Sequence, residues 1–586
     1  MVRRALGLIL LVVVPRLGMA VEIDSVLVPE GIDKQAGDPA LRLAEKVAVQ
    51  PLARLREASL GARDQLDAIA AWNRAGNVPA RNGFSRPLAL AKSVRFTADL
   101  LLGQPSRYAG GALLAPPSGG LVWAAEVKVE NAHRLRLHLS DVDLPPGTRM
   151  WVYGDEGGEE VSFEAGAVTS GREIWTPSVG GSAIRLEVRL PEKDLGGRGF
   201  TVDRVLETFE LDSEGAPVLG FSGNKVDFSC ALDAACQGTA ALATIEAYKR
   251  AVAHLQFVRD GDGFVCTGAL MNDTDDSTFV PYLLTANHCF NSQASASTLE
   301  SFFDYIAQGC LGTRPGLSSL PRTVGATLLA SGATTDFSFV RLSSLPAGRG
   351  LLGSTSEAVA SGTVLSRLSH PFGISQGFST ATLAPSGPTC VGTPRPNFLY
   401  SVRAQGAVFP GSSGAPVVRP DGRVVGQLLG ACGPTASTGE GCDSGNYTVD
   451  GALAVTWPSI AQWLAPAAGS PGCTPGAATL CLANGRFKVE ATYDTGAAQG
   501  QAKAVKLTDE TGYLWFFNES NVETVVKVLN GCGLNSRFWV FAGGLTNVQV
   551  RLTVTDTAKG TSKTYTNPPG TPFQPIQDTD ALATCP

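Results

Sequence analysis

Cysteine is absent from the first 229 residues of the chain. All 12 cysteines follow, eight of them between Cys230 and Cys442 and four between Cys473 and Cys585. An even number in each of two regions is what disulfide pairing within each region requires, and disulfides persist mainly outside the reducing cytosol. The distribution therefore argues against a cytosolic enzyme and indicates an exported protein.

Charge is also scarce. Charged residues make up 17% of the chain, below the roughly 25% that is usual for soluble domains. With 47 basic and 53 acidic residues the net charge is −6, so no basic excess indicates nucleic-acid binding. The 67 glycines and 36 prolines are typical of a turn-rich β protein rather than a fibrous or disordered chain. At roughly 150 residues per domain, the length predicts about four units, processing segments included.

Long hydrophobic runs are missing as well. The apolar run from Ala5 to Val14 is about half the roughly 20 residues that span a bilayer. It follows two arginines and precedes small residues that end at Ala20, which is the order of a secretory signal cleaved after Ala20. We expect residues 1–20 to be a signal peptide. The mature protein is then secreted, extracellular or periplasmic, without a membrane association.

Two patterns follow one another in the next part of the chain. Apolar residues recur at helical spacing between 41 and 75, and then alternate with polar ones at 135–139 and 184–190, which is typical of strands. Residues 21–222 are therefore predicted to form a helical lead-in followed by a small β domain. Because this part alone lacks cysteine, we interpret it as a propeptide that folds early and is then removed.

The last part of the chain is set off by a linker at 467–473, rich in small residues and proline. Residues 474–586 alternate again at 548–554 and hold dense aromatic clusters, which predicts a small β domain of sandwich type. Its four cysteines allow three connectivities, and the sequence leaves the choice open.

Three residues between the two flanking parts supply the groups of a nucleophilic triad. A strand-like run at 279–284 leads into His288, Asp336 follows in a segment of alternating apolar residues, and Ser413 lies in a Gly-Ser-Ser-Gly turn. A serine hydroxyl is a poor nucleophile unless a base takes its proton and a carboxylate fixes the tautomer of that base. We predict Ser413 as nucleophile, His288 as general base and Asp336 as the orienting carboxylate. Asp304 is the alternative carboxylate, but it lies close to His288 in the chain.

A glycine next to the serine fits the same chemistry. Gly411 lets the backbone turn so that its N–H and that of Ser413 point at one spot. Such a pair forms an oxyanion hole for a tetrahedral acyl intermediate. We therefore predict Gly411 and Ser413 as the oxyanion donors.

These motifs resemble a known family. Thr-Ala-Asn-His-Cys at 285–289 resembles the histidine motif of chymotrypsin-fold serine peptidases, and Gly-Ser-Ser-Gly-Ala-Pro at 411–416 is similar to their nucleophile motif. The cysteine pair at 230 and 236, Cys-Thr-Gly-Ala-Leu at 266–270 and Leu-Ser-His-Pro at 368–371 resemble the bacterial lysyl endopeptidase branch. The resemblance covers about 227–464, and the tail resembles a recurrent C-terminal domain of exported bacterial proteins.

The resemblance implies a mostly β protein. Residues 223–466 would form a chymotrypsin-like double β-barrel protease domain, with an N-terminal β-rich prosegment before it and the β-sandwich-like domain after it. In the family pattern Gly-x-Ser-Gly-x-Pro only Ser413 is followed by glycine, so Ser412 fills the variable position. The implied disulfides are Cys266–Cys289 and Cys236–Cys310, with Cys230 joined to Cys432 or Cys442 and the remaining cysteine of that pair joined to Cys390.

The side chain that selects the substrate residue before the cleaved bond (P1) is less well marked. Trypsin-like relatives carry an aspartate six residues before the nucleophile, where this chain has Ala407. The lysyl branch instead carries a pocket carboxylate downstream, for which Asp443 and Asp450 are candidates. We favour Asp450, which would pair with Lys or Arg at P1, or else would only cap a turn. That branch also has a histidine near the position of Leu429, and it is absent here.

Other enzyme classes fit poorly. An α/β-hydrolase needs Gly-x-Ser-x-Gly and a histidine after the serine, but Ala415 takes the second glycine position and no histidine follows Ser413. The five histidines have no zinc-protease spacing, and a cysteine nucleophile is excluded if all eight cysteines of the unit are paired. His254 and His370 are expected to be structural.

The sequence thus predicts a secreted serine endopeptidase made as a zymogen. It would act as a monomer on protein or peptide substrates, with no nucleic-acid partner and no metal or organic cofactor. If lysine is accepted at P1, cleavage after Lys225 would release the mature domain. The alternative is a catalytically silent binding or adhesion protein that keeps the fold.

Overall fold

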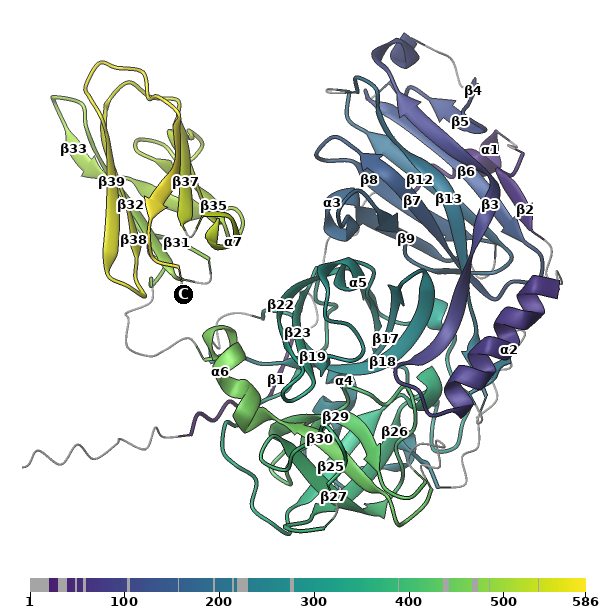
Figure 1. Ribbon diagram of the computed structural model, residues 1–586. Coiled ribbons are helices and arrows are strands. Elements are labelled where there is room, and N and C mark those ends of the chain that lie inside the picture. Colours follow the sequence, from purple (N-terminus) through teal and green to yellow (C-terminus); the bar gives the residue numbers. More distant parts are fainter. Residues whose placement is uncertain are drawn as a thin grey trace, which may run out of the picture. The chain divides into compact units, whose positions relative to one another are not determined.

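The computed structural model describes two compact units, which divide at Leu464 and Ala465. The described residues are 20–29, 39–47, 50–55, 60–102, 106–117, 119–155, 158–192, 195–212, 215–218, 230–274, 279–387, 389–435, 442–465, 473–483, 485–535 and 537–585. Residues 1–19 of the predicted signal peptide (1–20) and the predicted cleavage site at Lys225 lie outside these residues. With 47% strand and 12% helix, the predicted mostly β fold is confirmed (Figure 1).

The second half of the predicted protease domain is a closed barrel. Its strands are ordered β26-β25-β28-β29-β30-β27, and β27 pairs again with β26. The short β16 (Leu232–Asp233) adds to β26. The bounds are β25 Val364–Ser369, β26 Gly377–Leu383, β27 Phe398–Gln405, β28 Pro416–Val418, β29 Val424–Cys432 and β30 Tyr447–Ala452. Helix α6 (Leu453–Leu464) follows β30 directly.

The first half is a strongly curved sheet, ordered β21-β20-β17-β18-β19-β23-β22. Gly325 alone separates β21 from β22, so the two ends of the sheet meet. The bounds are β17 Val252–Arg259, β18 Asp262–Met271, β19 Tyr282–Ala286, β20 Glu300–Phe302, β21 Arg322–Val324, β22 Ala326–Gly332 and β23 Phe337–Leu342. Helices α4 (Ile245–Ala251) and α5 (Gln293–Ser297) flank it. Buried apolar side chains from both halves form one continuous core.

The predicted prosegment shares a sheet with this first barrel. Strand β3 (Ala80–Phe96) pairs along β13 (Arg198–Thr208) and also with the Asp262–Val265 end of β18. β7 (Arg134–Asp143), β10 (Ile174–Trp175) and β11 (Val179–Gly180) extend the same sheet. The prosegment and the protease domain, expected as separate units, therefore lie in one compact unit.

A second sheet completes the prosegment. It is ordered β4-β5-β6-β12-β8-β9, with β2 parallel to β6. Apolar side chains from both sheets, among them Trp123 and Phe200, are fully buried between them. The bounds are β2 Ala53–Leu55, β4 Ser106–Tyr108, β5 Gly111–Leu114, β6 Leu121–Val129, β8 Arg149–Gly154, β9 Glu160–Glu164 and β12 Ala183–Leu190. The hairpin β14 (Glu210–Leu211) and β15 (Pro217–Val218) and the short helix α3 (Ala165–Val168) complete the described part.

The helical lead-in is only partly as the sequence predicts. Helix α1 covers Leu43–Lys46 and α2 covers Leu60–Arg74, but the strand β2 lies between them. Pro51 fixes its own φ and disfavours a helical residue before it, so the helical spacing over 41–75 corresponds to two described helices with a strand between them. Apolar spacing alone did not reveal this break.

The segment that follows the predicted signal peptide packs on the first barrel. Strand β1 (Val26–Leu27) pairs with β24 (Gly350–Leu351), and Glu22 bridges to Thr355. Asn272 donates from its side chain to the Asp24 carbonyl at 2.9 Å. This segment is therefore part of the folded unit.

The C-terminal unit consists of two five-stranded sheets over one apolar core. One sheet holds β31 Leu480–Leu482, β32 Phe487–Asp494, β33 Gln499–Gln501, β38 Gln549–Asp556 and β39 Thr561–Asn567; the other holds β34 Lys503–Lys506, β35 Thr511–Trp515, β36 Thr524–Asn530, β37 Phe538–Gly544 and β40 Ile576–Leu582. Disulfides join Cys473 to Cys481 and Cys532 to Cys585. The predicted β-sandwich is confirmed.

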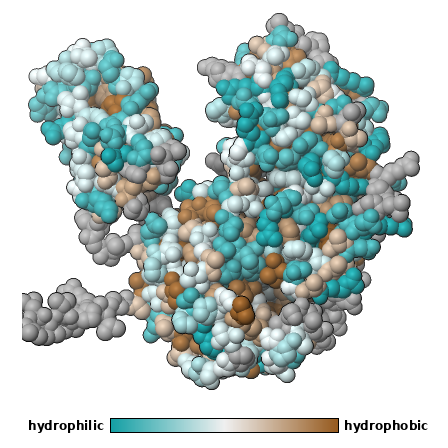
Figure 2. Space-filling view, viewed as in Figure 1, coloured by the Kyte–Doolittle hydropathy of each residue, from teal (hydrophilic) through white to brown (hydrophobic). Residues whose placement is uncertain are grey.

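The surface drawn in Figure 2 is mostly hydrophilic or neutral, with apolar residues in scattered patches. Within the described part of the chain, no helix combines the length and the apolar character that crossing a membrane requires.

Candidate active site

The three residues of the predicted triad come from strand ends of both barrels. His288 follows β19, and Asp336 directly precedes β23. Because β19 and β23 are paired neighbours, these two ends lie together. Ser413 comes from the second barrel, in the turn before β28.

Asp336 holds His288 at two points, the imidazole ring and the backbone N–H. Its Oδ2 lies 2.7 Å from His288 Nδ1, and its Oδ1 accepts the His288 backbone N–H at 2.9 Å. Asp336 is 5% exposed, so little water competes for the carboxylate. A proton on Nδ1 therefore donates to Asp336, which leaves Nε2 as the acceptor nitrogen.

The loop that carries Asp336 is anchored by the second barrel. Gln427 of β29 donates to the Thr335 carbonyl at 2.6 Å and to the Asp336 carbonyl at 3.2 Å. The Thr335 hydroxyl bonds that of Thr456 in α6 at 2.6 Å. Asp336 itself has φ +56°, a left-handed conformation that aspartate tolerates better than most residues. These contacts fix the carboxylate beside the histidine, and no sequence motif marked Gln427 or Thr456.

The nucleophile turn is attached to the strands that carry the histidine. Thr267 of β18 donates its backbone N–H to the Ser413 carbonyl at 2.8 Å. The Thr285 hydroxyl of β19 donates to the Thr267 carbonyl at 2.7 Å. His288 Nε2 is buried and has no hydrogen-bond partner among the described residues. The free Nε2 is thus available to accept a proton from a hydroxyl.

Two glycines of the turn have conformations and surroundings that exclude a side chain. Gly411 has φ +92°, and a Cβ there would lie 2.8 Å from the His370 carbonyl oxygen. Gly414 has φ +83°, and its Cβ would lie 2.2 Å from the Thr285 hydroxyl. Both positions therefore require glycine.

The alternative nucleophile and the alternative carboxylate are engaged elsewhere. The Ser412 hydroxyl is buried and lies 3.0 Å from that of Ser369. Asp304 pairs with Arg349 at 2.6 Å. Each of the two residues thus has a partner other than His288.

His254 and His370 lie together in the interior of the unit, with ring centroids 5.5 Å apart. Burial holds the pKa of His254 well below its ordinary value and lowers the pKa of His370 to about 4. His370 Nδ1 lies 2.7 Å from the Ile374 carbonyl, to which it must donate. Both rings are therefore neutral near pH 7.

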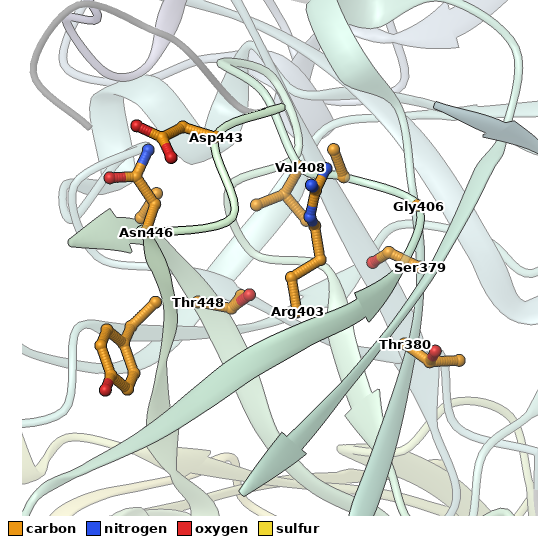
Figure 3. A pocket seen from close by; sticks show the side chains of 11 residues that line it. Ser379, Thr380, Arg403, Gly406, Val408, Asp443, Asn446 and Thr448 are labelled. Carbon is orange, nitrogen blue, oxygen red and sulfur yellow. The ribbon is translucent and has the colours of Figure 1, made fainter. Parts of the chain in front are cut away.

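A pocket is lined in part by the segment that leads toward the nucleophile turn (Figure 3). One side is the segment leading to Ser413, with Gly406, Ala407 and Val408, and the other is formed by Asp443 and Asn446 before β30. Ala407, six residues before Ser413, thus lies in the pocket as the sequence suggests. The Thr435 hydroxyl and the Gly445 N–H, both donating to it, lower the pKa of Asp443.

Asp450 does not line this pocket. Its side chain is 0% exposed and accepts from two nitrogens of the equally buried Arg367, one of them at 2.9 Å. The choice of Asp450 as the substrate carboxylate is therefore corrected. A fully desolvated carboxylate bonded by one guanidinium has no side open to a substrate. Of the two candidates, Asp443 is the one in the pocket.

The disulfides of the first unit brace the site. Cys266 is joined to Cys289, next to His288, and Cys236 to Cys310, the two pairs that the resemblance implies. Of the alternatives left open, the structure has Cys230–Cys442 and Cys390–Cys432. Cys442 precedes Asp443 and Cys432 follows the pocket residue Ala431, so the chain next to each of these two lining residues is cross-linked.

Comparison with known proteins identifies the family to which the chain is related. A family model described as "Lysyl endopeptidase, C-terminal domain" matches residues 225–447, and one described as "Lysyl endopeptidase N-terminal domain" matches 114–196. The chain belongs to the lysyl endopeptidase-like peptidase family. The second match lies inside the predicted prosegment, which shows that the family resemblance extends beyond the protease domain.

Two curated relatives match more distantly. A lysyl endopeptidase of Pseudomonas aeruginosa is 27% identical over 263 residues, which cover 44% of this chain and 55% of that protein. A secreted RxLR effector protein of Plasmopara viticola is 28% identical over 237 residues, which cover 38% of this chain and 53% of that protein. The chain thus spans about half the length of the curated relatives it matches.

Among solved structures, a protease from Mycobacterium tuberculosis is similar in its active form, with 17% identity and a TM-score of 0.25 over 37% of this chain and 82% of that one. Its inactive form has 15% identity and a TM-score of 0.26, over 37% and 91%.

Proposed function

We propose that this protein is a secreted serine endopeptidase that cleaves peptide bonds through Ser413, His288 and Asp336. The single observation that carries the proposal is the pair of contacts between His288 and Asp336, 2.7 Å and 2.9 Å, beside a nucleophile turn held by Thr267 at 2.8 Å. Membership in a peptidase family supports the same reading.

Acylation begins with transfer of the Ser413 hydroxyl proton to His288 Nε2. The oxygen attacks the carbonyl carbon of the substrate, and the N–H groups of Gly411 and Ser413 stabilise the oxyanion that forms. The imidazolium, held by Asp336, then gives its proton to the leaving amine as the C–N bond breaks. The result is an ester between Ser413 and the acyl part of the substrate.

Deacylation repeats these steps with water. His288 takes a proton from the water as it attacks the ester, and returns a proton to Ser413 as the ester bond breaks. No step requires a metal or an organic cofactor.

The prosegment and the disulfides support the proposed route of maturation. A six-disulfide chain is typical of an oxidising compartment, which fits secretion after cleavage of residues 1–20. We propose that residues 21–222 act as a propeptide of the zymogen, with 223–466 as the protease domain. We further propose that the enzyme acts as a monomer on protein or peptide substrates.

The P1 preference needs a new basis. Lys or Arg at P1 was expected to pair with Asp450, which is occupied by Arg367. The preference therefore depends on the residues that line the pocket.

Labelling with a fluorophosphonate tests the proposal. The processed wild-type protein should be labelled, and Ser413→Ala should not, while Ser412→Ala serves as a matched control that keeps the label. A correctly folded wild type that takes no label would contradict the proposal and would leave a catalytically silent binding or adhesion protein.

A further inference from the structure

The pocket beside the nucleophile turn contains a cation that the sequence did not mark. Arg403 lies on β27, ten residues before Ser413, and lines the pocket together with Ala407 and Asp443. In Figure 3 its side chain runs between the Asn446 side and the Ser379 side, with the guanidinium toward Val408. A side chain entering the pocket before Ser413 would therefore meet this guanidinium.

The two charged residues of the pocket, Asp443 and Arg403, differ in whether their side chains have hydrogen-bond partners. Asp443 accepts from the Thr435 hydroxyl at 2.6 Å and from the Gly445 N–H at 2.8 Å. Within the described part of the chain, the side chain of the half-buried Arg403 forms neither a hydrogen bond nor an ion pair, although its charge lowers the pKa of Asp443. The group that lacks a partner is the cation.

The free space in the pocket is small, about 20 Å³ for the centre of a water molecule, so a substrate side chain that enters would contact the lining residues directly. A lysine or arginine at P1 would have to displace Arg403 and would bring a second positive charge beside it. A carboxylate would supply the missing acceptor, in a charge-assisted hydrogen bond.

Hydroxyl groups on neighbouring strands add possible donors. Ser379 and Thr380 of β26 and Thr448 of β30 line the same pocket. The strands bring these side chains near Arg403, because β26 and β30 both pair with β27. A carboxylate that reaches Arg403 thus has hydroxyl donors at hand.

We infer that Arg403 is a specificity-determining residue and that the enzyme prefers an acidic residue, Glu or Asp, at P1. The inference rests on the proposed function, because the pocket serves P1 only if Ser413 is the nucleophile. It assigns Asp443 a secondary role, in which its charge counts only when Arg403 is removed.

The test is a set of peptides that differ only at P1, with Glu, Gln, Asp, Asn, Lys or Ala, cleaved by the processed full-length protein. We expect kcat/KM for Glu to exceed that for the isosteric Gln by at least about tenfold, and Lys to be cleaved more slowly than Gln. A wild type that prefers Lys to Gln would overturn the inference.

Variants of the two charged residues give the sharper comparison. Arg403→Ala should abolish the preference for Glu over Gln and make Lys better than Gln, since Asp443 is then the remaining charge. The double variant Arg403→Ala, Asp443→Asn should show neither preference. Arg551→Ala, which removes the same charge from an exposed position on β38 of the C-terminal unit, should keep the wild-type profile.

Fluorophosphonate labelling separates the two possible failures. A wild type that takes no label and cleaves no peptide contradicts the proposed function itself. A wild type that is labelled but shows the same Glu-to-Gln ratio as Arg403→Ala contradicts only the role of Arg403. Should Arg403→Ala fail to take the label, Arg403→Gln, of similar length and uncharged, carries the comparison, and an unchanged Glu-to-Gln ratio in it likewise overturns the inference.

Discussion

Arg367 and Asp450 form an ion pair in the interior of the second barrel. Arg367 Nε lies 2.9 Å from Asp450 Oδ1, Nη2 contacts Oδ2, and both side chains are 0% exposed. The strands β25 and β30 that carry them belong to the same closed barrel. The pair therefore holds the barrel that presents Ser413 and has no part in the pocket.

Loss of this pair should affect stability and leave specificity unchanged. Removing one partner of a buried ion pair typically costs about 3–5 kcal/mol, because the other charge is left unpaired. We expect Asp450→Asn to lower the free energy of unfolding by about 3 kcal/mol, measured by urea denaturation of the Ser413→Ala protein. In the active background its P1 profile should match the wild type; a changed profile would return Asp450 to the pocket.

Asp336 should be essential for turnover and dispensable for folding. Without its negative charge His288 loses the group that orients it and stabilises the imidazolium, an effect of about 10⁴-fold on kcat in such triads. We expect Asp336→Asn to reduce kcat by about that factor with little change in KM. Asp304→Asn is the matched control, because Asp304 pairs with Arg349; an equal loss in that variant would contradict the assignment.

The disulfide next to His288 should stabilise the site. Cys266 and Cys289 close a loop with a sequence separation of 23, for which chain entropy predicts about 3 kcal/mol. The double variant Cys266→Ala, Cys289→Ala should unfold at a lower urea concentration and lose activity. Cys473→Ala, Cys481→Ala removes a disulfide from the C-terminal unit and should retain activity against peptides.

Acid should destabilise the protein through His370. Burial lowers the pKa of His370 to about 4 from an ordinary value of 6.5, so the unfolded state binds a proton first as the pH falls. Stability is full above pH 6.5 and is lost between about pH 6.5 and 4, by about 3 kcal/mol at 1.36 kcal/mol per pKa unit. His370→Gln should show a smaller loss between pH 7.5 and 4.5 in urea denaturation, and an unchanged loss would exclude His370 as the cause.

The prosegment should stay bound after the chain is cut. Buried Glu300 of β20 lies 3.7 Å from Arg136 of β7 and 3.2 Å from Arg322, and its carboxylate accepts the Ser178 N–H at 3.0 Å. We expect the two pieces to co-elute in gel filtration, and Glu300→Gln to weaken that association. Glu357→Gln breaks an exposed pair with Arg419 and should not weaken it; separate elution of wild-type pieces would contradict the prediction.

Local motifs predicted much of this structure, and long-range pairing set the rest. Strands of period two, such as 184–190, fold as β12, because alternation reports which face is buried. The pairing of β3 with β18 joins residues far apart in the chain. The sequence of neither strand indicates which other strand it will pair with. Asp443 follows Cys442 in a Gly- and Ser-rich segment, whereas Asp450 lies in the strand β30, and nothing in the sequence near Asp450 reveals its buried partner Arg367. The sequence did not mark Arg403, because it belongs to no motif. A residue within a strand does not by its type alone show whether its side chain faces a pocket.

The disulfide between Cys230 and Cys442 links the proposed site of propeptide cleavage, before Cys230, covalently to the pocket next to Cys442. A fully extended chain advances about 3.5 Å per residue, so a bond cut a few residues before Cys230 stays within roughly 20 Å of Cys442. Cys442 adjoins Asp443. The new amino terminus is therefore linked to this pocket residue by a few residues and one disulfide. The cleavage site is thereby held at a high effective concentration near its own catalytic apparatus. If the residue before the cut bond is one that the pocket accepts, activation occurs within a single molecule and its rate is independent of protein concentration.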